Sequence, residues 1–450
     1  MAFSQGIFLI LGFSTIVPRM IMELSVVFLF LISIFIRLVR NNKVVVFGLL
    51  PVAGLFLTSL ISRHINSEPL LPFLIFLRHT FIFYVFFIAL LNLELRRSTY
   101  YRINKYLIFL FIIQIPANIV KFFIVGQTEG NIGTMSLHAG SLTTTFVLFA
   151  LAFTFSFFFF KKKVIYFLLI LGFLLFGFIG GKRAIPFYVP LLVIVIVYFY
   201  TMAIGWKNVF LSKTEVARIL LVFILCVANI YVATKVVPSL NPTQKFGGDF
   251  SLHFLVKYVF RTLTWTADGF EKDEIYAPDS KQQLDHTGRI TLGRYTTTLH
   301  VFKLLKKAGP LRVCFGFGAG NLVSSSLLHR GSTTDISLRK YDIRYGITGF
   351  VWFALQVGLV GVFFLVWLYV RILKRTVRLY KESSSQNYKT VALGFLGANF
   401  VFFLDFFTYS TSTLTLGVLT PAYFYVAIIL FKDFIPENQQ SQAHMICSNA

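Results

Sequence analysis

Residues 184–204 read AIPFYVPLLVIVIVYFYTMAI, a run that contains no Asp, Glu, Lys or Arg. About 20 apolar residues in a helix span the roughly 30 Å hydrocarbon core of a bilayer, so this run predicts a transmembrane helix. Apolar runs of similar length recur along most of the chain, and only 13% of all residues are charged. Soluble globular domains carry roughly 25% charged residues. The sequence therefore predicts an all-α integral membrane protein.

The apolar runs predict about 12 transmembrane helices, divided by one long polar segment. The expected spans are residues 3–17, 21–38, 44–61, 70–92, 105–125, 140–160, 164–180, 184–204, 217–236, 345–371, 390–408 and 412–431. The chain then divides into residues 1–237 with nine spans, a loop of residues 238–343, residues 344–432 with three spans, and a tail of residues 433–450. A loop of this length inside a helix bundle is usually functional.

The basic residues fall in five short clusters between apolar runs, and their placement predicts the orientation of the chain. The clusters contain Arg37, Arg97, Lys162, Lys213 and Arg375 with their basic neighbours. With 12 spans, all five clusters lie on one side, which the positive-inside rule assigns to the cytoplasm together with both termini. This placement accounts for the net charge of +24 without a nucleic-acid partner.

The side opposite the basic clusters carries the candidate binding residues. Lys182 and Arg183 follow two glycines in a tight turn there, although their charge breaks the positive-inside pattern. Glycine allows a close backbone approach, and arginine matches phosphate oxygens with its planar fork, so the turn is a candidate phosphate-binding corner. The alternative is a pair of interfacial anchors whose charged ends reach water.

The long loop holds the other candidates and is expected to be partly helical, over residues 250–266 and 292–308. Its candidate polar residues are Arg289, Arg294, His329, Asp335 and Arg344. Gly316, Gly318 and Gly320 predict a sharply turning backbone near a polar ligand, since the strand and helix of a dinucleotide fold do not surround them. No set of His, Cys, Asp or Glu has metal-ligand spacing, so neither a metal nor another cofactor is expected. Several arginines with few carboxylates fit a metal-free reaction of an activated, anionic substrate.

The order of these motifs resembles the O-antigen polymerase and O-antigen ligase family of bacterial envelope glycosyltransferases. Ile132–His138, ahead of an expected span, is similar to the family's Gly-Thr-Phe turn, and Gly181–Ala184 is similar to its small-Ser-Arg-Gly/Ala turn. Residues 287–289, followed by a helix, a proline and the glycine run, are similar to a family run of the same order. Tyr345–Gly349 resembles the Gly-x-x-Gly that opens the next span. The likeness covers about residues 130–360.

The resemblance implies an all-helical bundle in the bacterial inner membrane, with a large periplasmic loop. It also implies a glycan donor on a polyprenyl pyrophosphate, usually undecaprenyl pyrophosphate, that is used without metal or nucleotide. By motif position, Arg183 and Arg289 engage the pyrophosphate, with Lys182, Arg294 and Arg344 assisting. Membrane lipid and a chain-length regulator are the further expected partners.

The acceptor distinguishes the two activities of the family. Ligases carry a His-Asn pair eleven residues before the first Gly of Gly-x-x-Gly, where this chain has Asp335, and His329 lies six residues earlier. The sequence therefore favours a polymerase, in which a hydroxyl of a second lipid-linked repeat unit attacks, over a ligase that transfers the glycan to lipid A-core. Asp335 is the first expected proton acceptor and His329 the second, while Arg289 stabilises the leaving pyrophosphate. Ordinary polar loop residues are the alternative for both.

A transporter or flippase of lipid-linked oligosaccharide is the alternative from another class. Such a protein would place charged residues within helices around a midplane cavity, often in inverted repeats. Glu23 and Asp405 are the clearest acidic candidates inside the expected spans, while most of the polar content lies in one loop. A glycosyltransferase that uses a polyprenyl-phosphate sugar would need an acidic base in the first outer loop, where only Glu23 lies nearby.

Overall fold

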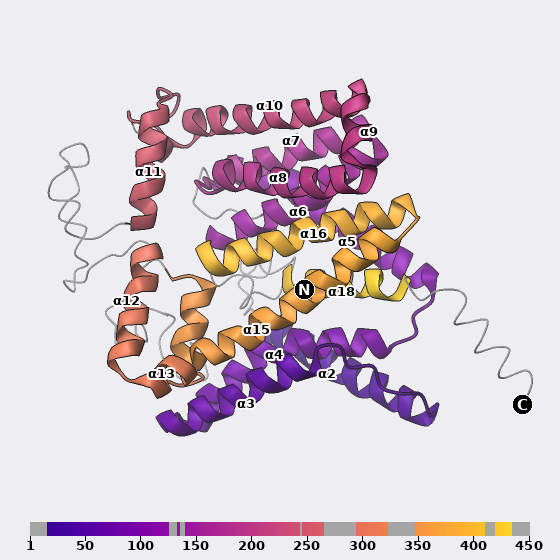
Figure 1. Ribbon diagram of the computed structural model, residues 1–450, viewed down its shortest axis with the longest axis vertical. Coiled ribbons are helices and arrows are strands. Elements are labelled where there is room, and N and C mark those ends of the chain that lie inside the picture. The colour runs from indigo at the N-terminus through magenta and orange to yellow at the C-terminus, as the bar shows by residue number, and fades with distance from the viewer. Residues whose placement is uncertain are drawn as a thin grey trace, which may run out of the picture.

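The computed structural model describes residues 16–125, 133–135, 140–243, 245–264, 294–322, 347–409 and 419–433. The regular secondary structure of these ranges is entirely helical (Figure 1). The long helices are α2 (Ile16–Val39), α3 (Leu49–Asn66), α4 (Leu70–Asn92), α5 (Arg97–Val125), α6 (Gly140–Lys161), α7 (Val164–Ile179), α8 (Ile185–Ile204), α10 (Lys213–Val236), α15 (Gly349–Glu382), α16 (Gln386–Leu404) and α18 (Leu419–Asp433). The short elements are α9 (Trp206–Leu211), η2 (Pro238–Leu240), α11 (Leu252–Thr264), α12 (Arg294–Lys307), α13 (Pro310–Phe315) and η6 (Asp405–Tyr409).

Eight helices in these ranges are long and apolar enough to cross a membrane, and α7 and α18 are shorter apolar helices. The chain is therefore a multi-pass, all-α membrane protein, as the sequence predicted. Helices lie at eleven of the twelve expected spans, and the first expected span, residues 3–17, lies almost wholly outside the described ranges. The count of 12 spans stays a prediction. The expected break at residues 18–20 is absent, because α2 already runs through these residues.

The centre of the bundle is the antiparallel pair of α6 and α16. Among the candidate spans, α6 is the most deeply buried inside the protein. The hydroxyl of Ser156 donates to the carbonyl of Thr390 toward one end of the pair, and Thr145 reaches Asp405 toward the other. Hydroxyl groups in a membrane interior bond to neighbouring helices because no water is available there. These two contacts fix the register of α6 against α16.

The basic loops meet at one end of the bundle. Arg40 pairs with Glu94, which joins the loop before α3 to the loop before α5. Lys162, in the turn before α7, pairs with Glu215 at the start of α10. Lys161, the last residue of α6, donates to the side chain of Asn387 at the start of α16. In Figure 1, α9 marks this end at the right, and α11, α12 and α13 lie at the left. The assignment of the basic end to the cytoplasm stays a prediction.

A buried charge network closes the basic end around Glu215, which is only 5% exposed. Its carboxylate accepts hydrogen bonds from Lys162 at 2.7 Å, from Arg218 at 2.8 Å and from the hydroxyl of Tyr200 at 2.6 Å. These donors come from the turn before α7, from α10 and from α8. One carboxylate therefore connects three consecutive segments of the bundle.

Glu215→Ala is expected to lower the free energy of unfolding by about 2 kcal/mol, because a buried hydroxyl and two cations lose their shared partner. Equilibrium unfolding of the purified protein in detergent measures the change. Glu382→Ala is the matched control, since Glu382 pairs with Arg378 at an exposed position, and exposed pairs contribute less than about 1 kcal/mol. Equal effects of the two substitutions would show that the network stabilises no more than a surface pair does.

The opposite end of the bundle is covered by α11, α12 and α13. Helices lie at the positions expected for residues 250–266 and 292–308, as α11 and α12, within the part of these ranges that the structure describes. The helix α13 was not expected from the sequence. It begins at Pro310, whose fixed φ suits the first residue of a helix.

The glycine run after α13 packs its backbone directly against two membrane helices. Gly316 and Gly320 have φ angles of 72° and 104°, a region that favours glycine. A Cβ on Gly316 would collide with the backbone of α15, and a Cβ on Gly320 would collide with the backbone of Pro72 in α4. The sharply turning backbone is thus confirmed, and close helix packing explains these glycines. The polar ligand expected beside them stays a prediction.

The helix α15 is broken at Gly358, and the segment after α13 fills the break. Gly358 has φ 68° and ψ −172°, so the carbonyls that precede it lose their helical partners. The amide of Phe317 donates to the carbonyl of Leu355 at 2.7 Å, and the hydroxyl of Ser62 donates to the carbonyl of Gln356 at 2.6 Å. Backbone groups in a membrane interior require such replacements. The break therefore ties α3, α15 and the covering segment into one unit.

Candidate functional site

A buried carboxylate lies where α16 ends, at the end of the bundle opposite the basic loops. Asp405 is 3% exposed and is the first residue of η6, a single π-helical turn. The hydroxyl of Thr145, on α6, donates to Oδ1 of Asp405 at 3.0 Å. Ionisable residues inside membrane spans face the bundle interior and usually mark functional sites, and π-helical turns often occur at such sites. Asp405 is therefore the centre of the candidate site.

Two tyrosines extend the site beyond the carboxylate. The hydroxyl of Tyr188, in the first turn of α8, shares a hydrogen bond of 3.0 Å with Oγ1 of Thr408. The hydroxyl of Thr144 donates to the hydroxyl of Tyr409 at 3.2 Å. The two tyrosine rings meet edge to face, with centroids 5.9 Å apart. Three helical elements, α6, α8 and η6, thus place hydroxyl groups around one point.

Arg294, the first residue of α12, brings a positive charge to the same site. Its Nε donates to the carbonyl of Tyr409 at 3.1 Å, and its guanidinium carbon lies 4.6 Å from the centroid of the Tyr409 ring. This arrangement combines a hydrogen bond with a cation–π contact. Arg294, which the sequence predicted as a pyrophosphate ligand, thus contacts Tyr409 in the same π-helical turn as Asp405.

The turn between α7 and α8 lies at the same end and carries Lys182 and Arg183. The side chain of Lys182 is buried, with 1% exposure, whereas Arg183 is exposed. The sequence favoured Arg183 over Lys182 as the functional residue, and this stays a prediction. Both precede Ile185, where α8 begins, and the amino end of a helix carries a partial positive charge. The turn therefore adds positive potential to this end.

The expected turn before α6 is held inside the bundle by polar side chains of α5. The amide of Gly133 donates to Oδ1 of Asn118 at 3.1 Å, and the amide of Thr134 donates to Oε1 of Gln114 at 2.9 Å. Met135 is 1% exposed. This part of the motif therefore has a structural explanation, since its backbone groups find partners within the bundle.

Four predicted site residues lie outside the described residues. They are Arg289, His329, Asp335 and Arg344. Their predicted roles in pyrophosphate binding and proton transfer stay predictions. Within the described ranges, no group of three or more His, Cys, Asp or Glu could hold a metal ion.

The sequence marks Asp405 as an acid inside an expected span but does not predict its partners. Thr145 and Asp405 are separated by 260 positions along the chain, so their contact depends on the packing of α6 against α16. The sequence features that could have indicated the contact are a single carboxylate in an apolar run and several threonines at the start of another expected span. Motif order pointed to the loop instead.

No protein-family model, curated protein or solved structure matches the chain. The resemblance to the O-antigen polymerase and ligase family therefore rests on the order of the sequence motifs. The geometry of the site is an independent observation, because the positions of Asp405 and its hydroxyl neighbours were not part of those motifs.

Proposed function

We propose that the chain is a polysaccharide polymerase, a metal-independent glycosyltransferase of the bacterial inner membrane. It transfers a glycan from polyprenyl pyrophosphate, such as undecaprenyl pyrophosphate, to a hydroxyl of a second lipid-linked repeat unit at the periplasmic face. The observation that supports this most is the meeting of Arg294, Asp405 and two tyrosine hydroxyls at the end opposite the basic loops. A cation and a buried carboxylate are the two charges that such a transfer needs.

The cations at this end are suited to the donor. In the proposal, Arg294, Lys182 and Arg183 bind the pyrophosphate together with Arg289 and Arg344. The guanidinium group of an arginine can donate two parallel hydrogen bonds to phosphate oxygens. Its positive charge also stabilises the negative charge that develops on the leaving group. Arg294 is well placed because its Nε donates to the carbonyl of Tyr409 and its guanidinium group lies over the Tyr409 ring. Its orientation is therefore fixed before a donor arrives.

Asp405 joins Asp335 and His329 as a candidate proton acceptor. The acceptor oxygen forms a bond to the anomeric carbon, the bond from that carbon to the pyrophosphate breaks, and the hydroxyl proton passes to the base. The hydrogen bond from Thr145 orients the carboxylate of Asp405. Burial among helices protects the reaction from water, which would otherwise compete with the acceptor hydroxyl.

The proposed function predicts that purified protein extends lipid-linked glycans without added metal or nucleotide. Undecaprenyl-pyrophosphate repeat units from the host are supplied, and the products are separated on a gel. A ladder of lengthening lipid-linked glycan is the expected result. Transfer only after lipid A-core is added would identify a ligase instead. Movement of the lipid-linked oligosaccharide across vesicles without any transfer would favour a transporter.

A further inference from the structure

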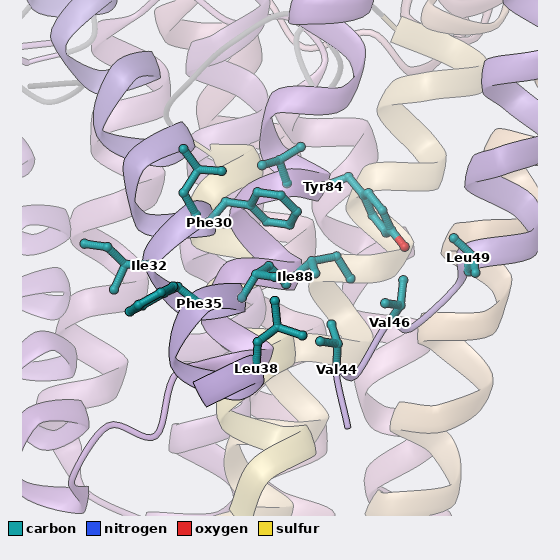
Figure 2. Close-up of a pocket in the computed structure, with 12 residues that line it drawn as sticks. Phe30, Ile32, Phe35, Leu38, Val44, Val46, Leu49, Tyr84 and Ile88 are labelled. Atoms are coloured by element: carbon teal, nitrogen blue, oxygen red, sulfur yellow. The ribbon is translucent and has the colours of Figure 1, made fainter. Parts of the chain in front are cut away.

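An open apolar groove runs along the outer face of α2 and α4, with a volume of about 830 Å³. Its walls are α2, from Phe30 to Leu38, and the segment from Val44 to Leu49, while Tyr84 and Ile88 of α4 lie along its floor (Figure 2). Small-molecule sites have volumes of roughly 300–1,000 Å³. The groove lies on helices that are apolar enough to cross the membrane. It is therefore large enough for a ligand and open to lipid.

The lining of the groove fits a hydrocarbon chain. Tyr84 is the one lining residue with a polar side chain, and its hydroxyl donates to the carbonyl of Phe47 at 2.8 Å. The wall from Phe30 to Leu38 rises about 12 Å along the helix axis. That length is close to half of the roughly 30 Å hydrocarbon core, which is the depth of one leaflet. A single acyl chain can thus lie along the groove within one leaflet.

The mouth of the groove at the basic end carries an excess of positive charge. Arg37 and Arg40 both pair with Glu94, at 3.3 Å and 2.9 Å. Lys43 is exposed and has no ion partner among the described residues. Lys432 also lies here, because its Nζ donates to the carbonyl of Leu93 beside Glu94. The cations at the mouth therefore outnumber the single carboxylate. These charges lie next to Leu38 and Val44, where the apolar walls end.

We propose that this groove binds an anionic phospholipid of the leaflet at the basic end. One acyl chain lies between α2 and α4, and the phosphate contacts Lys43 and Arg40. A zwitterionic lipid would fill the groove equally well, but its own cation would be repelled at the mouth. The charge at the mouth therefore selects the headgroup, and the groove selects a lipid over a soluble anion. The proposal is independent of the catalytic function.

The test measures which lipids the full-length protein retains. The protein is placed in nanodiscs of equal phosphatidylglycerol and phosphatidylcholine and extracted in mild detergent, and the bound lipid is quantified by mass spectrometry. Wild-type protein is expected to retain phosphatidylglycerol preferentially. Lys43→Gln is expected to reduce this preference about fivefold, the effect of one basic side chain near a membrane surface. Val85→Phe, which places a larger side chain in the groove, is expected to reduce retention of both lipids.

Lys163→Gln is the matched control. Lys163 is an exposed lysine at the same end of the bundle, directly before α7, and it does not line the groove. Its substitution should leave the lipid preference unchanged. Retained lipid in the ratio of the nanodiscs would overturn the proposal, as would equal effects of Lys43→Gln and Lys163→Gln. Lys43 is exposed, so its substitution tests the headgroup even if Val85→Phe does not fold.

Discussion

Gly358→Ala is expected to destabilise the protein by roughly 3 kcal/mol or more. Two effects act together. The φ of 68° and ψ of −172° at this position lie in a region that is almost restricted to glycine and costs other residues about 1–3 kcal/mol. In addition, a Cβ would collide with the backbone carbonyl of Cys314, which cannot move away as a flexible side chain could. Equilibrium unfolding in detergent measures the loss.

Gly309→Ala separates the two effects. Gly309 precedes α13 and also has a positive φ, of 100°, but nothing lies within 4 Å of the position that its Cβ would take. Its substitution should cost only the backbone strain, about 1–3 kcal/mol. The difference between the two variants then reports the close packing of α13 against α15. If both variants lose the same stability, the packing of α13 against α15 contributes little.

The transmembrane helices were predictable because each depends on a local property. Residues 184–204 form a helix from 185 to 204, and residues 70–92 form α4 with the expected bounds. Length and hydropathy determine such elements without reference to the rest of the chain. The break at Gly358 was not predictable in this way. Its glycine lies inside an expected span, and only the partner segment after α13 distinguishes it from a glycine in a regular helix.

The candidate site was predictable only in part, for the same reason. Arg294 was identified as a cation on the side opposite the basic clusters, and this depended on topology. Its neighbours Tyr409 and Asp405 follow α16, and Thr145 lies on α6. These contacts depend on the order in which helices pack, which hydropathy does not encode. The burial of Lys182 rather than Arg183 likewise depends on how α7 and α8 turn into the bundle.

Asp405→Asn is expected to slow glycan transfer by about 10²–10³ while leaving the fold intact. The amide keeps an oxygen that can accept the hydrogen bond from Thr145, so the packing of α6 against α16 is retained. It cannot take up the proton of the acceptor hydroxyl, and general-base catalysis contributes about 10²–10⁴ in rate. The initial rate of ladder formation by purified protein, at equal amounts of folded protein, measures the effect.

Glu23→Gln is the control, because it tests whether the loss of a carboxylate from any membrane helix slows glycan transfer. Glu23 also lies within a membrane helix, where it pairs with Arg78 at 3.6 Å between α2 and α4. Because this pair joins two outer helices rather than lining the site, its loss should leave the transfer rate within about twofold, although stability decreases. Full activity of Asp405→Asn would show that the base lies elsewhere, with Asp335 and His329 as the remaining candidates. Equal loss in both variants would mean that charge inside the helices, rather than a base beside Arg294, controls the reaction, as in a transporter.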